Sequence, residues 1–195
     1  AYEAMKLRSG DTITVNENGF LRMKLDKDKY VYLEGAALIH LIAEGDEKDS
    51  KTVINIELGT MITEVQNKLS DRSSYDINTP STTMAIRGTV TVTEVTYDLK
   101  EQEDAVSKDA LLQFLLEKNG YAEIDIDENT DPSLKEMQDT LKTAFEQGVD
   151  VAASNYVQEG KVQISTFEKE NAEGTTYLTV VQIPVEAGNG FTKTT

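Results

Sequence analysis

The sequence contains no cysteine and a single histidine, and these scarcities exclude several kinds of chemistry. Without cysteine, neither a disulfide framework nor a thiolate metal site is possible. With only His40, a Cys-His catalytic pair or a two-histidine metal site cannot form within one chain. His40 would point away from its neighbours Ile39 and Leu41 on a strand, so we expect a surface or hydrogen-bonded residue in preference to a general base or metal ligand.

The sequence also lacks the common enzyme fingerprints. It contains no Gly-x-Ser-x-Gly elbow, no Walker-type glycine loop and no dinucleotide fingerprint, and Gly188-Asn189-Gly190 is too short to count as one. The enzymatic option that remains is a carboxylate pair of the glycosidase type, but among 35 acidic residues some pair will always look suitable. We therefore expect a protein that is not an enzyme, with a carboxylate-based hydrolase as the alternative.

No window has the unbroken apolar length of a membrane span, and no basic stretch leads into an apolar segment at the start. The chain begins at Ala1 without a methionine. We expect any targeting or anchoring segment to lie outside it.

Positive charge is scarce, with 19 Lys and Arg against 35 Asp and Glu and a net charge of −16. Residues 98–159 hold sixteen acids and five lysines, and so carry eleven of the sixteen net negative charges. Such a surface repels phosphate backbones and gains nothing from an anionic membrane face. We predict no nucleic-acid binding and no direct lipid binding. The acidic surface either keeps the chain soluble or docks a basic partner.

Residues 11–97 show an apolar pattern with a period of two, as in Leu21, Met23 and Leu25, which is typical of β-strands with one buried face. Turn-forming Asn, Asp and Gly clusters interrupt this pattern about every ten residues. The regular spacing without helices favours a sandwich, a roll or a solenoid-like stack. The β pattern resumes after Gly160.

Residues 98–159 instead show apolar residues at helical spacing. Ser107 is placed to cap one helix that ends at Gly120, and Asp131-Pro132 is typical of the start of a second. Apolar residues between Val149 and Val157 predict a third helix that runs to Gly160. Helices this short must pack on one another or on the sheet, and a peptide-binding groove between them is the alternative to a simple core.

The run from Asn78 to Val90 consists of a strand, a proline stop and a second strand entered through Arg-Gly-Thr. It resembles the signature segment of the FecR family. Further segments that are similar to the family's pattern are Met5–Thr12, Asn18–Leu21, Tyr30–Leu33, Ile56–Met61, Lys161–Gln163 and Val185–Gly188. The match covers residues 5–97 and 160–190. Residues 98–159 depart from the family pattern, in which a short loop joins the corresponding strands.

The resemblance implies a mainly β, FecR-like twisted β-roll or β-helical stack of short strands. Residues 1–97 and 160–195 would form this domain, and residues 98–159 an inserted acidic helical subdomain. The implied role is a non-catalytic extracytoplasmic sensing or protein-interaction module at the cell surface or in the periplasm, with a protein partner and a membrane anchor upstream of this chain. A structural or calcium-binding cell-surface module is the alternative.

Within the FecR-like segment, each residue has a fold-keeping role as its first interpretation, and recognition by a partner as its second. Pro80 has no amide hydrogen and would end the first strand. Gly88 permits a bulge or a close backbone approach, and Arg87 would hold a carboxylate or carbonyls with its planar fork. The motif residues are Asn78, Thr79, Pro80, Met84, Arg87, Gly88 and Thr89.

One acidic segment has the spacing of an EF-hand-like calcium loop, with oxygen ligands at Asp125, Asp127, Asn129, Asp131 and Glu136. Two positions depart from the pattern, because Thr130 replaces the glycine of the sharp turn and Pro132 replaces an apolar strand residue. The alternative is a short strand over residues 121–127, a loop and a capped helix. Calcium is the one cofactor that the sequence suggests.

Overall fold

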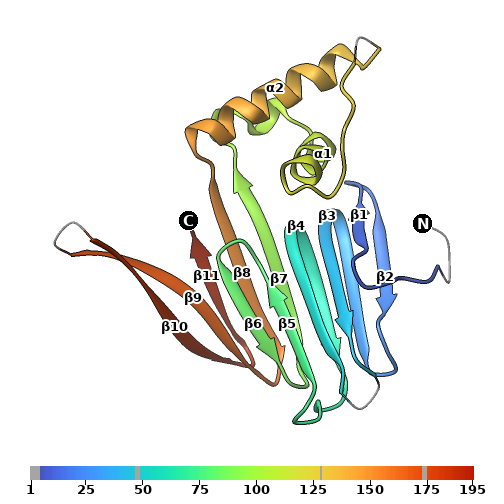
Figure 1. Ribbon diagram of the computed structural model, residues 1–195, viewed down its shortest axis with the longest axis vertical. Helices are drawn as coiled ribbons and strands as arrows, with labels where there is room; N and C mark the ends of the chain where they lie inside the picture. The colour runs from blue at the N-terminus through green and yellow to red at the C-terminus, as the bar shows by residue number, and fades with distance from the viewer. Residues whose placement is uncertain (1–4, 47–48, 128, 173–174) are drawn as a thin grey trace.

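The computed structural model describes residues 5–46, 49–127, 129–172 and 175–195. The described residues form one large sheet and a small helical layer, with the chain order shown in Figure 1. The strands are β1 (Thr12–Val15), β2 (Phe20–Lys24), β3 (Lys29–Glu44), β4 (Lys51–Val65), β5 (Ser74–Asn78), β6 (Thr82–Ile86), β7 (Val90–Asp98), β8 (Asp150–Glu159), β9 (Lys161–Ala172), β10 (Thr175–Glu186) and β11 (Asn189–Thr194). The helices are the 3-10 helix η1 (Lys100–Ala105), α1 (Lys108–Lys118) and α2 (Pro132–Gln147).

The sheet forks at β4. Along one edge β4 pairs with β3, which also pairs with β1 and β2. Along its other edge the first half of β4 pairs in parallel with β5, and the second half pairs antiparallel with β7. One branch then continues through β6, β9 and β10, and the other through β8 and β11.

The main core contains side chains from both branches. Buried residues that belong to it include Val31 and Ile54 on the central strands, Ile77 and Met84 on one branch, and Val157 on the other. A hydrogen bond joins the branches inside this core: Asn155 Nδ2 on β8 donates to Thr82 Oγ1 on β6 over 3.1 Å. The same side chain is held on its own branch, because Asn155 Oδ1 accepts from Thr93 Oγ1 on β7, also over 3.1 Å. These contacts hold β6 against β7 and β8, so the sheet is bent back on itself.

The two predicted helix starts are confirmed. Ser107 is the N-cap of α1 and accepts a hydrogen bond from the Ala110 amide, and Asp131 caps α2 by accepting from the Ser133 amide. The helices lie at one end of the sheet (Figure 1) and share a second apolar core with Leu38 and Leu58. Members of this core from the helices include Ala110, Leu111, Leu112, Leu115 and Leu141.

The predicted third helix is wrong, because residues 150–159 form strand β8. Ala153, Asn155 and Val157 are buried at alternate positions, as a strand between β7 and β11 requires. The apolar residues of this segment satisfy a period of two as well as a helical period, and pairing with two distant strands selects the first. The helical part of residues 98–159 therefore ends at Gln147. No strand forms over residues 121–127 either.

The mainly β fold class with a helical insertion is confirmed. The division of the chain into two domains stays a prediction. The helices α1 and α2 share their core with side chains from β3 and β4.

Candidate protein-docking surface

Residues 78–90 form the end of β5, the turn of the β5–β6 hairpin, strand β6 and the entry to β7. Pro80 lies in the turn, where Thr79 Oγ1 accepts hydrogen bonds from the amides of Ser81 and Thr82. Asn78 Nδ2 donates to Asn55 Oδ1 on β4 over 3.0 Å, and Met84 is fully buried in the main core. These contacts tie the hairpin to the neighbouring strand.

Gly88 makes a close backbone approach. It has φ of +100°, and a Cβ at this position would lie 3.0 Å from Lys68 Cα. Thr89 follows as a buried residue whose carbonyl accepts from the Val65 amide. Only glycine combines this backbone angle with this spacing.

The planar fork predicted for Arg87 is not formed. Its side chain is 63% exposed and has one ion-pair contact, in which Nη1 lies 4.0 Å from Asp71 Oδ1. A contact of this length between two exposed groups is weak. Arg87 therefore does not act as the structural clamp that its position in the segment suggested.

Two of the calcium-loop candidates, Asp127 and Asp131, have carboxylate oxygens engaged in local hydrogen bonds. Asp127 accepts from the Asn129 amide and side chain, and Asp131 accepts from the Ser133 amide and hydroxyl. These hydrogen bonds lower the pKa of both carboxyl groups. Glu136 lies on α2. Among the described residues no group of three or more His, Cys, Asp or Glu is arranged to hold a metal ion, and the calcium site stays a prediction.

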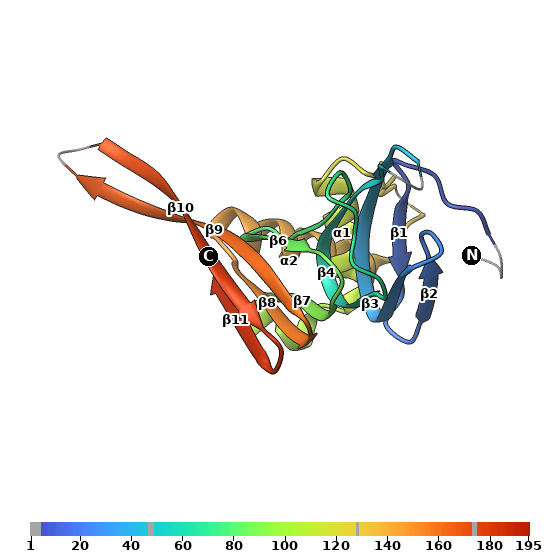
Figure 2. The same cartoon turned by 90° about the horizontal axis from the view of Figure 1, so that it is seen from below.

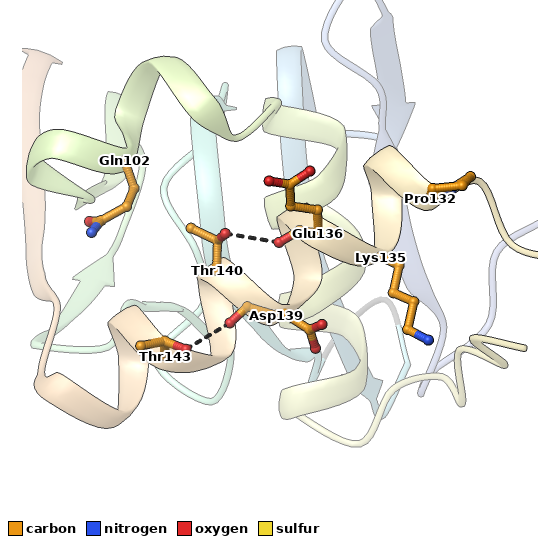
Figure 3. Close-up of a pocket in the computed structure, with 7 residues that line it drawn as sticks. All are labelled: Gln102, Pro132, Lys135, Glu136, Asp139, Thr140 and Thr143. Carbon is orange, nitrogen blue, oxygen red and sulfur yellow. Dashed lines mark hydrogen bonds between the residues drawn. The ribbon is translucent and has the colours of Figure 1, made fainter.

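A shallow depression of about 510 Å³ lies on the outer side of α2 (Figure 3). Glu136 and Asp139 line it, but they project from neighbouring positions of one helix, whereas glycosidase carboxylates flank the substrate from two sides. The hydroxyls of Thr140 and Thr143 donate to carbonyls of the same helix. The depression therefore gives no support to the hydrolase alternative. The other lining residues are Gln102, Pro132 and Lys135.

Beneath the helical layer, His40 makes the contacts of a structural residue. Its Nδ1 is 3.0 Å from Thr12 Oγ1, and its ring stacks on Tyr121 with centroids 4.9 Å apart. The Tyr121 hydroxyl donates to Glu57 Oε1 over 3.5 Å. Burial raises the pKa of Glu57, against the opposing effects of Tyr121, Lys118 and His40. These contacts fasten the segment after α1 to the sheet.

A row of apolar and aromatic side chains crosses the same face of the sheet outside the helical layer. Tyr32 on β3 pairs with Ile62 on β4, Ile62 with Val92 on β7, and Val92 with Tyr156 on β8. We call these four residues the cross-strand row. Tyr156 is 45% exposed and Ile62 is 37% exposed. The neighbouring residues along these strands, such as Met61 next to Ile62, point into the core. The side chains of the cross-strand row therefore face outward.

Charged groups border the cross-strand row. Arg22 on β2 pairs with Tyr32, and its guanidinium carbon lies 5.7 Å from the Tyr32 ring centroid. Glu94 on β7 and Glu64 on β4 flank the row on its two sides, and Glu64 Oε2 accepts from the Tyr32 hydroxyl over 3.4 Å. Apolar residues with a charged rim and exposed tyrosine are typical of protein interfaces.

Sequence reasoning missed this row, although a signal was present. Both Tyr30-Val31-Tyr32-Leu33 and Thr60-Met61-Ile62-Thr63 place apolar side chains on successive positions, so each strand has apolar groups on both faces. A one-sided sheet would alternate apolar with polar residues. The pattern alone cannot show that the outward residues of four strands lie side by side.

A second exposed apolar group lies on the β9–β10 hairpin, which projects from the body of the molecule (Figure 2). Phe167 pairs directly with Val180, and Leu178 is two residues along the same strand face. Their exposed fractions are 60%, 55% and 62% for Phe167, Val180 and Leu178. The hairpin therefore presents a second surface that is suited to contact with another protein.

No family model matches this sequence, and no curated protein matches it. Two crystal structures of a candidate anti-sigma factor from Parabacteroides distasonis ATCC 8503, at 1.65 and 2.50 Å resolution, are similar to this chain, each with a TM-score of 0.45 and 13% identity. Each match covers 95% of this chain and 59% of the other protein. The chain thus spans less than two thirds of that protein, and a likeness at this level does not assign a function. No helix among the described residues is long and apolar enough to cross a membrane.

Proposed function

We propose that the chain is a non-catalytic, extracytoplasmic protein-interaction module of the FecR type, which binds a protein partner through the cross-strand row. The observation that carries this proposal is the outward alignment of Tyr32, Ile62, Val92 and Tyr156 on four adjacent strands. A sheet face that is built for solvent alone has no need of two tyrosines and two aliphatic side chains in one line.

The resemblance of residues 78–90 to the FecR signature supports the extracytoplasmic assignment and the sensing role. In that arrangement the module stands outside the cytoplasmic membrane, on an anchor encoded beyond this chain, and transmits the state of its partner. The acidic residues of the helical insertion disfavour nucleic-acid binding, because they would repel the phosphate groups.

Partner capture tests the docking proposal. The immobilised chain, an Ile62→Ser/Tyr156→Ser variant and a Phe20→Ser control are exposed to the solubilised envelope fraction of the source cells, and retained proteins are quantified by mass spectrometry. Phe20 is a matched control because it is 66% exposed and lies outside the row. We expect one protein that is retained by the parent and by Phe20→Ser but is lost from the double variant. Equal retention by all three chains would overturn the proposal.

Localisation is tested separately by protease treatment of intact and lysed cells that produce the full-length protein. Cleavage of this region without lysis of the cytoplasmic membrane is expected. Protection until that membrane is opened would contradict the extracytoplasmic assignment.

A further inference from the structure

Strand β10 forms an unusually bare edge of the sheet. It spans Thr175–Glu186 and, among the described residues, pairs only with β9. No charged residue occurs between Thr175 and Val185. Natural edge strands are usually protected by charged side chains, by proline or by a covering element, because their unpaired backbone groups otherwise accept another strand.

The other edges of this sheet have such protection. Strand β1 is only four residues long, strand β2 carries Arg22 and Lys24, and β11 is six residues long and carries Lys193. On β10 the one protective residue is Pro184, near the end of the strand. The backbone of residues 177–183 is left available for pairing.

We propose that this edge pairs with β10 of a second copy of the chain, in an antiparallel arrangement around a twofold axis at Thr179. A twofold axis perpendicular to the sheet keeps each side chain on its own face, so one residue must lie opposite itself. With Thr179 on the axis, Leu178 of each copy lies opposite Val180 of the other. The pairing joins the ladder of hydrogen bonds across both copies.

Two chains of net charge −16 repel each other as wholes, but the lack of charge on β10 itself favours an uncharged strand over a basic partner at this edge. A basic partner, which the net charge of −16 would otherwise attract, finds no carboxylate between Thr175 and Val185. The strand that fits an uncharged, β-prone edge is itself uncharged and β-prone, and β10 has that composition. In this register threonine meets threonine on the axis, and leucine meets valine on each side of it, so neither a charge nor a lone polar group opposes an apolar one there.

Pairing also explains why apolar side chains gather on an exposed hairpin. The twofold axis places Phe167, Leu178 and Val180 of one copy on the same face as those of the other, and cross-strand contacts between leucine and valine then cover part of their exposed area. The inference goes beyond the proposed function, because the cross-strand row lies on β3, β4, β7 and β8 and does not include this edge.

A cysteine introduced at Thr179 tests the register directly, since the chain has no cysteine of its own. Opposed residues in an antiparallel pair have Cα atoms about 4.5–5.5 Å apart, within the range of a disulfide. We expect Thr179→Cys to form a covalent dimer under mild oxidation, well over tenfold faster than a Thr192→Cys control on the exposed strand β11. Equal rates for the two variants would overturn the register.

Sedimentation equilibrium tests the dimer without any cysteine. We expect the parent chain to be dimeric at about 100 µM, and a Leu178→Lys/Val180→Lys variant to be monomeric with an unchanged circular dichroism spectrum. A monomeric parent chain overturns the inference. This failure is distinguishable from failure of the proposed function, because the monomeric lysine variant retains the cross-strand row and can be assayed for partner capture by itself.

Discussion

The side-chain amide of Asn155 on β8 donates to the hydroxyl of Thr82 on β6, over 3.1 Å and across the two branches of the sheet. Asn155 is 1% exposed and Thr82 is 4% exposed. The same asparagine accepts from Thr93 Oγ1 on β7, so one side chain links three strands. A buried amide without partners would be costly, and here its two ends are satisfied by strands from opposite branches.

Replacement of Asn155 by alanine is expected to lower the free energy of unfolding by about 2 kcal/mol, because the buried hydroxyls of Thr93 and Thr82 each lose a hydrogen bond. Chemical denaturation measures the loss. Ser154→Ala is the matched control on the outer face of the same strand, and we expect it to change stability by less than about 0.5 kcal/mol. A similar loss in both variants would mean that the buried amide does not link the branches.

Gly88→Ala is expected to be more destabilising than Gly120→Ala. Both glycines have positive φ, at +100° and +70°, so both variants incur backbone strain of about 1 kcal/mol. At Gly88 the new Cβ would also lie 3.0 Å from Lys68 Cα, whereas nothing lies within 4 Å at Gly120. Thermal unfolding of the two variants compares them, and equal losses would show that the chain relaxes around Gly88.

Arg87→Ala is expected to change the free energy of unfolding by less than about 0.5 kcal/mol, since its ion pair is exposed and long. The same thermal unfolding measurement applies. A loss comparable to that of Gly88→Ala would restore the structural clamp that the sequence suggested.

Glu57→Gln is expected to be more stable than the parent chain at pH 7 and to lose that advantage in acid. Burial raises the pKa of Glu57 in the folded state above its ordinary value of 4.5. Below that ordinary value the group is protonated in both states; as pH rises through the raised folded pKa, the buried charge lowers stability. Denaturation at pH 4 and pH 7 measures the difference, with Glu34→Gln as an exposed control. If the difference in stability between Glu57→Gln and the parent chain is the same at both pH values, the buried charge of Glu57 is not its cause.

Asp131→Ala is expected to lower the melting temperature through loss of the α2 cap, both with and without millimolar calcium. Thermal unfolding with calcium or with a chelator measures this. If calcium raises the melting temperature of the parent chain and not of the variant, the loop from Asp125 to Glu136 is a calcium site after all.

The helix ends were predictable because capping is local. Ser107 and Asp131 bind amides two or three residues away, and the sequence contains everything that such a contact needs. The helix prediction for the segment around Asn155 was wrong for the opposite reason, because the structure there depends on distant contacts. Its apolar residues fit two periods, and its burial depends on Thr82 and Thr93, which lie 73 and 62 positions away in the chain.

The candidate site follows the same division. Gly88 was predictable as a close approach, because glycine reports a backbone requirement at its own position. The contacts of the Arg87 side chain were not predictable, because the sequence does not show whether a carboxylate lies within reach. The cross-strand row requires the register of four strands, and one slip of a strand would turn its side chain into the core.

The sequence by itself determined the apolar periodicity of the strands and of the first two helices, their two N-caps, the glycine-dependent turn and the acidic character of residues 98–159. All of these are set by neighbours in the chain or by composition. The tertiary structure decided that residues 150–159 are a strand, that Asn155 joins two branches, that Tyr32, Ile62, Val92 and Tyr156 lie in one line, and that β10 is left as an edge. These features depend on pairing between distant segments, and that pairing is fixed when the whole sheet closes around its core.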